Sequence, residues 1–300
     1  MIIQEKQRDI EASMPLETQE IGFAAEGSEF LHEILRNSIY KNKIRSACRE
    51  TILNAADSHK RAGKENIQFE IQIPTKIDCR FSCRDYGVGL DKEKTKYYFA
   101  SYGSSLSRKS NDYHGAFGLG ALSPFCVVSA YSVISFYNGK KYVFRSYIDQ
   151  ENKDRFDLIA EEDTNEFNGV EVSWPVDSYK IDEYKNHIVD LIRFFPVKPI
   201  LKGLSTPLSY PTPYIKGNGW QCFSDGHSKV VQGFVAYDLP QSYEFDNLNE
   251  NQKRLLAAGI ILFCPIGTIK VTASRENIQM VESVKNKIAE KLDTAIKEIQ

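Results

Sequence analysis

The sequence predicts an α+β protein: a larger domain built on antiparallel strands, followed by a smaller α/β domain. Three observations favour this class. A helical segment precedes two strand-like runs, the dipeptide Asn138-Gly139 separates two further β-rich runs, and an amphipathic helix with proline-punctuated chain begins near residue 178. Asn-Gly between β-rich runs is the strongest local hairpin signal. Strands that follow one another without intervening helices favour antiparallel pairing over a doubly wound parallel sheet.

Length and composition bound the class of protein. With 300 residues, 42% of them hydrophobic and 26% charged, the chain is long enough for two globular domains, which we place at residues 1–178 and 179–300. A net charge of −2 gives no general attraction to nucleic acid or anionic lipid, so either contact needs a local patch. No apolar run approaches the roughly 20 residues that span a bilayer. The six cysteines are scattered in apolar surroundings, so we expect a cytoplasmic protein with reduced thiols.

The first domain contains the most regular segment of the chain, a helix expected within NKIRSACRETILNAADSHKRAG (42–63), where apolar residues recur at helical spacing before Gly63. The runs IQFEIQIP (67–74) and DCRFSCRDYG (78–87) predict a hairpin. Residues 91–114 are polar and aperiodic, which predicts a long functional loop. The apolar run after residue 120 is expected to begin a helix.

The second domain is expected to hold strands at residues 229–237 and 259–271, with one or two helices between them. A C-terminal helix is expected from about residue 277 to Gln300. No stop signal ends that helix, which suggests a piece of a longer protein.

Two polar motifs in the first domain carry candidate chemistry. Glu50, Asn54 and Asp57 lie at i, i+4 and i+7 and therefore share one stripe of the helix, separate from its apolar stripe. In RDYGVGL, Asp85 ends a strand, and two glycines let the backbone approach a ligand closely. Taken alone, the first motif also fits a solvated helix face and the second an ordinary turn.

A third motif, NDYHGAFGLGALSPF (111–125), places three glycines before an expected helix. Several backbone N–H groups that point to one place near a helix start suit an anion. The motif lacks the G-K-[ST] ending of a Walker A loop. A glycine hinge that ends a mobile loop is an equally good interpretation of this motif alone.

The order and spacing of the three motifs resemble the GHKL ATPases, which include gyrase B, MutL, heat-shock chaperones and histidine kinases. Over about residues 37–176 the chain is most similar, within that superfamily, to the rIIA family of T-even-type bacteriophages. A distant segment, VTASRENIQ (271–279), is similar to the part of the chaperone middle domain whose arginine and glutamine reach the terminal phosphate of the nucleotide.

This resemblance implies a Bergerat-type fold, in which ATP lies over a mixed, largely antiparallel sheet with helices on one face, followed by a transducer-like domain. It implies slow, Mg²⁺-dependent ATP hydrolysis, with Glu50 as general base, Asn54 as magnesium ligand and Arg275 as donor to the transition-state charge. Residues 92–117 would form a lid over the nucleotide. The other residues implied are Gln279 as a catalytic helper, and Asp57, Asp85, Gly87, Gly89, Ser104, Ser105, Lys109, Gly115, Phe117, Gly118, Leu119, Gly120 and Gly169 as nucleotide contacts.

The resemblance also implies a nucleotide-dependent homodimer, with residues 1–35 as an exchanged arm, and a role in phage lysis inhibition with a membrane-associated or host protein partner. Two other hypotheses stay open. One is a MutL-like or gyrase-like ATPase that acts on DNA, for which Lys198 and Lys202 are the nearest basic candidates. The other is a non-hydrolysing module in which ATP only orders the lid. A histidine kinase is the least favoured branch, because no histidine lies in a recognisable phosphoacceptor helix.

Overall fold

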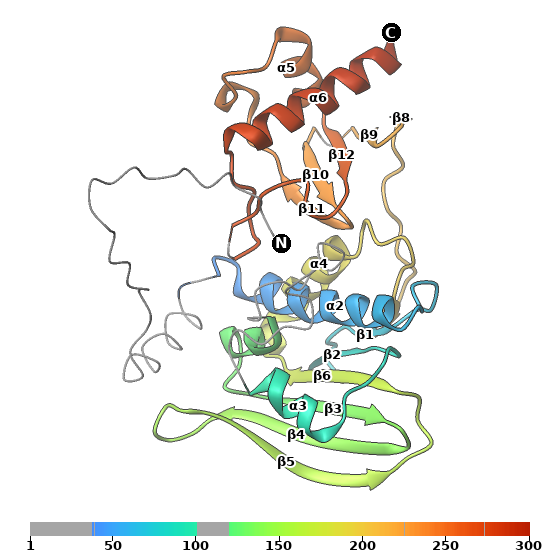
Figure 1. The fold of residues 1–300 in the computed structure, drawn as a ribbon, viewed down its shortest axis with the longest axis vertical. Helices are drawn as coiled ribbons and strands as arrows, with labels where there is room; N and C mark the ends of the chain where they lie inside the picture. The colour runs from blue at the N-terminus through green and yellow to red at the C-terminus, as the bar shows by residue number, and fades with distance from the viewer. Residues whose placement is uncertain (1–37, 39, 101–119, 225, 273) are drawn as a thin grey trace, which may run out of the picture.

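The computed structural model contains two sheets, one above the other, with helix α2 (Lys43–Arg61) between them (Figure 1). It describes residues 38, 40–100, 120–224, 226–272 and 274–300. Most neighbouring strands in both sheets are antiparallel, and helices pack on them, so the predicted α+β class is confirmed. The lower sheet in Figure 1 belongs to the first unit of the chain and the upper sheet to the second.

Helix α2 begins and ends where its sequence supplies capping groups, close to the predicted bounds. Asn42 precedes it, and the Asn42 side-chain oxygen accepts a hydrogen bond from the backbone N–H of Arg45. Lys60 and Arg61 occupy the last turn, where the helix dipole favours positive charge, and Gly63 follows with a φ of 65°. The apolar stripe of the helix, which includes Cys48 and Ile52, is buried in the core.

Seven strands form the first sheet, in the order β5-β4-β3-β6-β2-β1-β7. Every neighbouring pair is antiparallel except β1 and β7, which run parallel. Both predicted hairpins are present: β1 pairs with β2, and β3 pairs with β4 across Asn138 and Gly139, whose φ angles are 49° and 77°. The strands are β1 (Glu70–Gln72), β2 (Arg80–Arg84), β3 (Ala130–Tyr137), β4 (Lys140–Ile148), β5 (Asp154–Asp163), β6 (Gly169–Pro175) and β7 (Ile200–Lys202).

The loop predicted for residues 91–114 is wrong in its first part, because residues Lys92–Phe99 form helix α3. The Asp91 side chain caps this helix by accepting a hydrogen bond from the backbone N–H of Lys94. Only Thr95 and Phe99 are buried, so a helix this short shows almost no apolar periodicity. Residues 101–119, which include the rest of the expected lid, lie outside the described residues.

The helix expected after residue 120 is a 3-10 helix, η2 (Gly120–Cys126), and not an α-helix. Pro124 lies inside it and has no N–H to donate to the carbonyl of Gly120, as an α-helical turn would require. The side chains of Leu122 and Phe125 are buried, which holds η2 against the core.

The first unit continues past the boundary expected near residue 178. The 3-10 turn η3 (Ser178–Lys180) leads into helix α4 (Ile181–Leu191), which packs beside α2. Tyr184 of α4 accepts a hydrogen bond from Trp174 Nε1 at 2.9 Å, and Trp174 packs against Phe81 with ring centroids 4.3 Å apart. Strand β7 then joins the edge of the first sheet beside β1, so this sheet ends only at Lys202.

The second sheet has five strands in the order β11-β10-β12-β9-β8, with β10 and β12 parallel and the other pairs antiparallel. The strand expected over 229–237 is two strands that turn at Gly233, and the strand expected over 259–271 ends at Cys264. The C-terminal helix starts later than expected, because Ile278 still bridges to Val271. The elements are β8 (Ile215–Gly217), β9 (Trp220–Cys222), β10 (Lys229–Gln232), β11 (Val235–Asp238), η4 (Ser242–Glu244), α5 (Glu250–Ala257), β12 (Ile260–Cys264) and α6 (Glu282–Ile299).

One extended segment, residues 203–214, links the two units in the described part of the chain. It carries Pro207, Pro211 and Pro213, which belong to the proline-punctuated stretch noted in the sequence. Tyr210 donates a hydrogen bond from its hydroxyl to the carbonyl of Val189 at 3.1 Å, which fastens the segment to α4. Across the described residues, helices with the length and apolar character of a membrane span are absent.

The packing of α4 within the first unit can be tested by mutation. Ile188 is 0% exposed, and Ile188→Ala is expected to lower the free energy of unfolding by about 2–5 kcal/mol through lost burial and the cavity left behind. Tyr179→Ala is the control, because that side chain is 80% exposed, and its effect should stay within about 0.5 kcal/mol. Since the chain has 2 tryptophans, denaturant unfolding followed by Trp174 fluorescence in a Trp220→Phe background reports the first unit. Equal losses for the two variants would contradict the packing.

Candidate functional site

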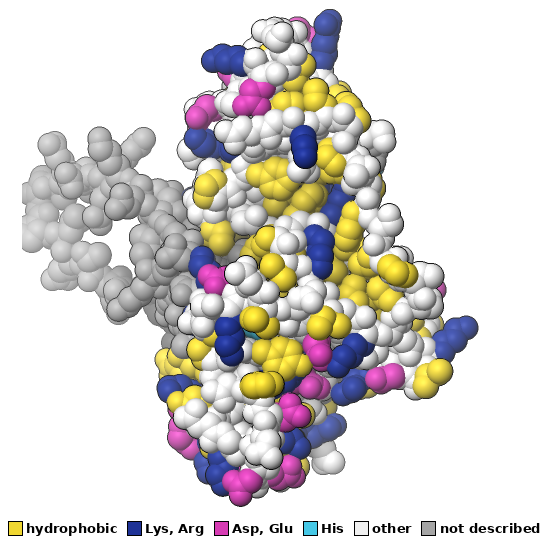
Figure 2. Space-filling model, turned by 90° about the vertical axis from the view of Figure 1, so that its right-hand side faces the viewer, with side chains coloured by type: hydrophobic (Ala, Val, Ile, Leu, Met, Phe, Trp, Pro, Cys, Tyr) yellow, Lys and Arg dark blue, Asp and Glu magenta, His cyan; other side chains and the backbone are white. Residues whose placement is uncertain are grey.

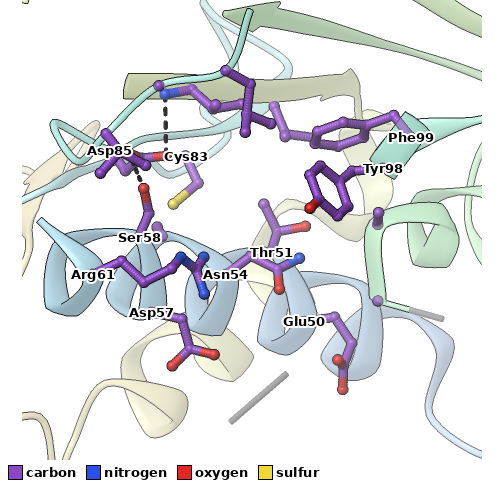
Figure 3. Close-up of a pocket in the computed structure, with 18 of the residues that line it drawn as sticks. Glu50, Thr51, Asn54, Asp57, Ser58, Arg61, Cys83, Asp85, Tyr98 and Phe99 are labelled. Carbon is purple, nitrogen blue, oxygen red and sulfur yellow. Dashed lines mark hydrogen bonds between the residues drawn. The ribbon is translucent and has the colours of Figure 1, made fainter. Parts of the chain in front are cut away.

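A cavity lies between α2 and the first sheet, and Figure 3 shows side chains that line it. The space between its walls is about 990 Å³, including the part that is open to solvent. Val88, Leu90, Val170 and Val172 supply apolar lining, and the second unit contributes Arg275. The cavity therefore offers a ligand both apolar contact and charged groups.

The polar stripe of α2 forms one wall of the cavity. Glu50, Asn54 and Asp57 all line it, so the structure brings together the residues that the helical spacing placed on one face. Ser58 and Arg61 continue the same wall toward the C-terminal end of the helix (Figure 3). Glu50 and Asp57 are buried, whereas Asn54 is partly exposed to the cavity.

Asp85 follows β2 and also lines the cavity, with its carboxylate buried. Its Oδ1 accepts hydrogen bonds from Ser58 Oγ and from the N–H of Gly87, both at 2.9 Å, and its Oδ2 accepts from the N–H of Val170 at 3.1 Å. Burial raises the pKa of Asp85, and the bonds from Gly87 and Ser58 oppose that rise. A carboxylate has about four acceptor positions, so one position remains for a ligand N–H.

The turn after β2 is shaped by α2. His59 Nε2 accepts a hydrogen bond from the N–H of Tyr86 at 2.8 Å, and His59 Nδ1 donates to the carbonyl of Ile67 at 3.0 Å. These two partners together require the neutral tautomer with its proton on Nδ1. A Cβ at Gly87 would overlap Ser58 Oγ. The absence of a Cβ at Gly87 therefore lets the turn after β2 pack closely against Ser58 of α2.

The remaining predicted nucleotide glycines in the described chain also lie at this site. Gly89 and Gly120 line the cavity, and Gly169 starts β6 directly before Val170. A Cβ at Gly169 would overlap the carbonyl oxygen of Asp85, so the two segments touch through their backbones. A Cβ at Gly120 would come within 2.8 Å of Glu50 Oε2. Glycine at position 120 thus keeps the space beside the Glu50 carboxylate open.

Glu50 has two arginine partners. Its Oε2 accepts from Arg275 Nη1 at 3.2 Å, and its Oε1 accepts from Arg49 Nη2 at 3.3 Å. All three side chains are buried: Glu50 is 4% exposed, Arg275 8% and Arg49 4%. Buried charges are tolerated when they are paired and hydrogen-bonded. The two guanidinium groups therefore offset the desolvation of this carboxylate.

Arg49 also holds the loop that carries Arg275. Arg49 Nη1 donates to the carbonyl of Arg275, and Arg49 Nη2 donates to the carbonyl of Ser274, each at 2.7 Å. Arg275 has a φ of 55°, in the left-handed region that non-glycine residues adopt at some cost. The backbone of this loop is thus fixed by a side chain of the first unit.

Glu276 fastens the same loop to the start of α2. Its Oε1 accepts from the N–H of Asn42 at 2.7 Å and from Ser46 Oγ at 3.1 Å, and its Oε2 accepts from the N–H of Lys41 at 2.9 Å. Burial alone would raise the pKa of Glu276, but the bonds from Lys41 and Asn42 lower it below its ordinary value. The contribution of this carboxylate to stability is therefore present above the ordinary glutamate pKa and is lost as the pH falls.

Other predicted residues are not brought to the cavity by the described structure. Gln279 is not among its lining residues, and the Gln279 backbone N–H donates to the carbonyl of Lys270 at 2.8 Å. The predicted contacts Ser104, Ser105, Lys109, Gly115, Phe117, Gly118 and Leu119 lie outside the described residues.

The basic candidates for DNA binding have structural partners. Lys198 Nζ donates to the carbonyls of Arg193 and Phe195 at 2.6 and 2.8 Å, and Lys202 forms an ion pair with Glu70. On the face in Figure 2, the described Lys and Arg side chains are scattered, and many lie beside Asp or Glu. That face offers no extended basic stripe among the described residues, which a phosphate backbone would need.

Several residues of the site were not predicted from the sequence. Ser58 lies at i+4 from Asn54, so the helical spacing could have found it. Arg49 and Glu276 are neighbours of predicted residues, yet their contacts cross more than two hundred positions and leave no local signal. Tyr98 and Phe99 line the cavity from α3, a helix that the sequence did not reveal.

The donor set suits magnesium only together with phosphate. Among the described residues, no group of three or more His, Cys, Asp or Glu side chains could hold a metal. Mg²⁺ commonly takes one or two protein oxygens and completes its shell with phosphates and water. Asn54, which offers a neutral oxygen to the cavity one helical turn from Glu50, fits that arrangement.

Comparison with known proteins leaves the site to be interpreted from its own geometry. No protein-family model matches the chain, and no curated protein matches it.

Gly89 and Gly63 make a matched pair for testing the cavity backbone. Both have left-handed φ angles, 69° and 65°, but a Cβ at Gly89 would overlap the carbonyl oxygen of Phe136, whereas nothing lies within 4 Å of one at Gly63. Gly63→Ala is expected to lower the free energy of unfolding by about 1 kcal/mol, the cost of the left-handed conformation. Gly89→Ala should cost about 2–4 kcal/mol because a backbone overlap is added. Denaturant unfolding read through Trp174 measures both, and equal costs would show that the Gly89 site is open.

Proposed function

We propose that this chain binds ATP with Mg²⁺ in the cavity beside α2 and hydrolyses it slowly, as a nucleotide-gated ATPase of the GHKL, or Bergerat-fold, type. The adenine would lie toward Asp85, and the phosphates toward Glu50 and Gly120. The largely antiparallel first sheet, with α2 and α4 on it, supports this class of fold. The order of the three sequence motifs along the chain supports it independently.

The contact between Glu50 and Arg275 carries the proposal. The two residues are 225 positions apart in the sequence, and the resemblance implies a role for both at the terminal phosphate of ATP. Phosphoryl transfer to water needs a group that orients the water and a cation that neutralises the transferring phosphate. Because their side chains meet at 3.2 Å within one cavity, both can reach the same phosphate.

The other end of the cavity supports recognition of adenine. Asp85 keeps one acceptor position after its three hydrogen bonds, which suits a base with an exocyclic amino group. Val88, Leu90 and Val172 give the base apolar contact. The Ser58 hydroxyl and the two backbone N–H groups fix the carboxylate, so its orientation is set before the base binds.

Glu50 would have to exchange a partner before it can act as a base. Both of its oxygens accept from guanidinium groups. A terminal phosphate in the cavity competes for Arg275, and as that guanidinium turns to the phosphate, Glu50 Oε2 becomes free to take a proton from water. Arg49 keeps the other oxygen and so holds the carboxylate in place. Mg²⁺ held by Asn54 would supply neutralisation of phosphate charge.

Replacement of Glu50 tests the catalytic part. Glu50→Gln should bind a non-hydrolysable ATP analogue with Mg²⁺ about as well as the natural sequence, measured by isothermal titration. Its turnover should fall by about 10²–10⁴-fold, because the amide cannot take the proton. Glu282→Gln, which changes an exposed carboxylate at the start of α6, is the control and should leave both values unchanged. Undiminished turnover in Glu50→Gln would refute its role, and turnover of zero in the natural sequence with intact binding would favour the nucleotide-sensing module.

Replacement of Asp85 tests the binding part. Asp85→Asn should weaken binding of the ATP analogue by about 10-fold or more, since it loses a charged acceptor for the base. Asp157→Asn is the control, because that carboxylate pairs with Tyr147 on the exposed edge of the first sheet. Trp174 fluorescence during unfolding shows whether Asp85→Asn remains folded. A folded Asp85→Asn variant with undiminished affinity would exclude this carboxylate from the nucleotide site.

The cellular setting of the proposal rests on the resemblance alone. We include nucleotide-dependent dimerisation and a phage role of the rIIA kind, lysis inhibition with a host or membrane-associated partner. Sedimentation of the chain with and without the ATP analogue tests the dimer, and an unchanged monomer would remove that part.

A further inference from the structure

Glu276 joins the two units outside the cavity, because it is not among the residues that line it. Its carboxylate belongs to the second unit, and its three donors, the N–H groups of Lys41 and Asn42 and the hydroxyl of Ser46, belong to the first. The first N–H groups at the start of a helix have no partner within the helix. Asn42 is the N-cap of α2 and Lys41 precedes it, so a side chain from the other unit binds the backbone N–H groups where the chain enters α2.

The position of Glu276 next to Arg275 gives this contact a further consequence. The backbone of Arg275 is left-handed, and such a conformation persists in a non-glycine residue when its surroundings determine it. Arg49 donates to the carbonyl of Ser274 and to the carbonyl of Arg275 itself, and the side chain of the next residue, Glu276, binds the start of α2. The arginine is therefore clamped from both neighbours, with its guanidinium directed at Glu50.

We propose that Glu276 is a positioning residue, which sets the Arg275 guanidinium at the reacting end of the cavity by binding the start of α2. Glu276 does not line the cavity and acts only through Arg275. The kinetic part of this inference rests on the proposed ATPase function. The geometric part, that Glu276 keeps Arg275 buried against Glu50, does not.

The kinetic test compares Glu276→Gln with Arg275→Ala and with the double variant. Glu276→Gln should lower kcat for ATP by about tenfold or more, since small misplacements of a catalytic group are costly, and should leave KM within about twofold. The double variant should be no slower than Arg275→Ala alone, because a residue that acts through Arg275 has no effect without it. Glu282→Gln is again the control on the same unit. An additive double variant, or a Glu276→Gln variant with unchanged kcat, would overturn the kinetic part.

The geometric test needs no turnover. An arginine-specific dicarbonyl reagent, followed by mass spectrometry, measures how fast Arg275 reacts, with Arg80 as internal reference because its side chain is 48% exposed. Glu276→Gln should speed the reaction at Arg275 severalfold and leave Arg80 unchanged. Hydrogen exchange at the Lys41 and Asn42 amides should speed up in the same variant, because their acceptor is weakened. An unchanged rate at Arg275 would overturn the positioning role.

The two tests separate the possible failures. If the natural sequence hydrolyses no ATP while Glu276→Gln exposes Arg275, the proposed hydrolysis is wrong and the positioning of Arg275 stands. If ATP is hydrolysed and Glu276→Gln changes neither kcat nor the reactivity of Arg275, the proposed function stands and the role of Glu276 is refuted.

Discussion

A single buried carboxylate, shared by two guanidinium groups, is the interaction around which this protein is organised. Burial of the Glu50 carboxylate is costly unless a positive charge pairs with it. Arg49 binds one of its oxygens and Arg275 binds the other. One of the arginines comes from α2 itself and the other from the second unit. The burial of this charge therefore depends on the contact between the units, and the contact in turn draws the loop at residues 274–276 onto the helix.

Helix α2 contacts the core, the cavity and the second unit. Its apolar stripe packs into the core, its polar stripe lines the cavity, and its first residues receive the carboxylate of Glu276. A helix buried on several sides must find a partner for each polar group it carries. Ser58 shows this economy, because its hydroxyl donates to Asp85 and its backbone lies against Gly87. Because α2 is rigid, a shift of the helix at the core, at the cavity or at Glu276 also moves its contacts at the other two places.

The sequence predicted what depends on local spacing. Helix α2, its polar stripe and the hairpin at Asn138-Gly139 follow from periodicity and turn chemistry, and all three are present. Helix α3 was missed because eight residues with two buried side chains carry little periodic signal. Strand β7 was missed because it has only three residues and pairs with β1, about 130 positions earlier in the chain, so neither its length nor a nearby turn marks it as a strand. The roles of Arg49 and Glu276 depend on which distant segments meet, and spacing along the chain cannot supply that.

The segment at residues 203–214 is a covalent linker that keeps the second unit close to the first. Fully extended, it can reach only about 40 Å, and Tyr210 fastens its middle to α4. A short tether of this kind gives its two ends an effective concentration in the millimolar range. Contact between the arginine loop and α2 is thus an intramolecular event whose equilibrium does not depend on protein concentration. The length of this segment therefore sets how strongly the two units favour contact over separation.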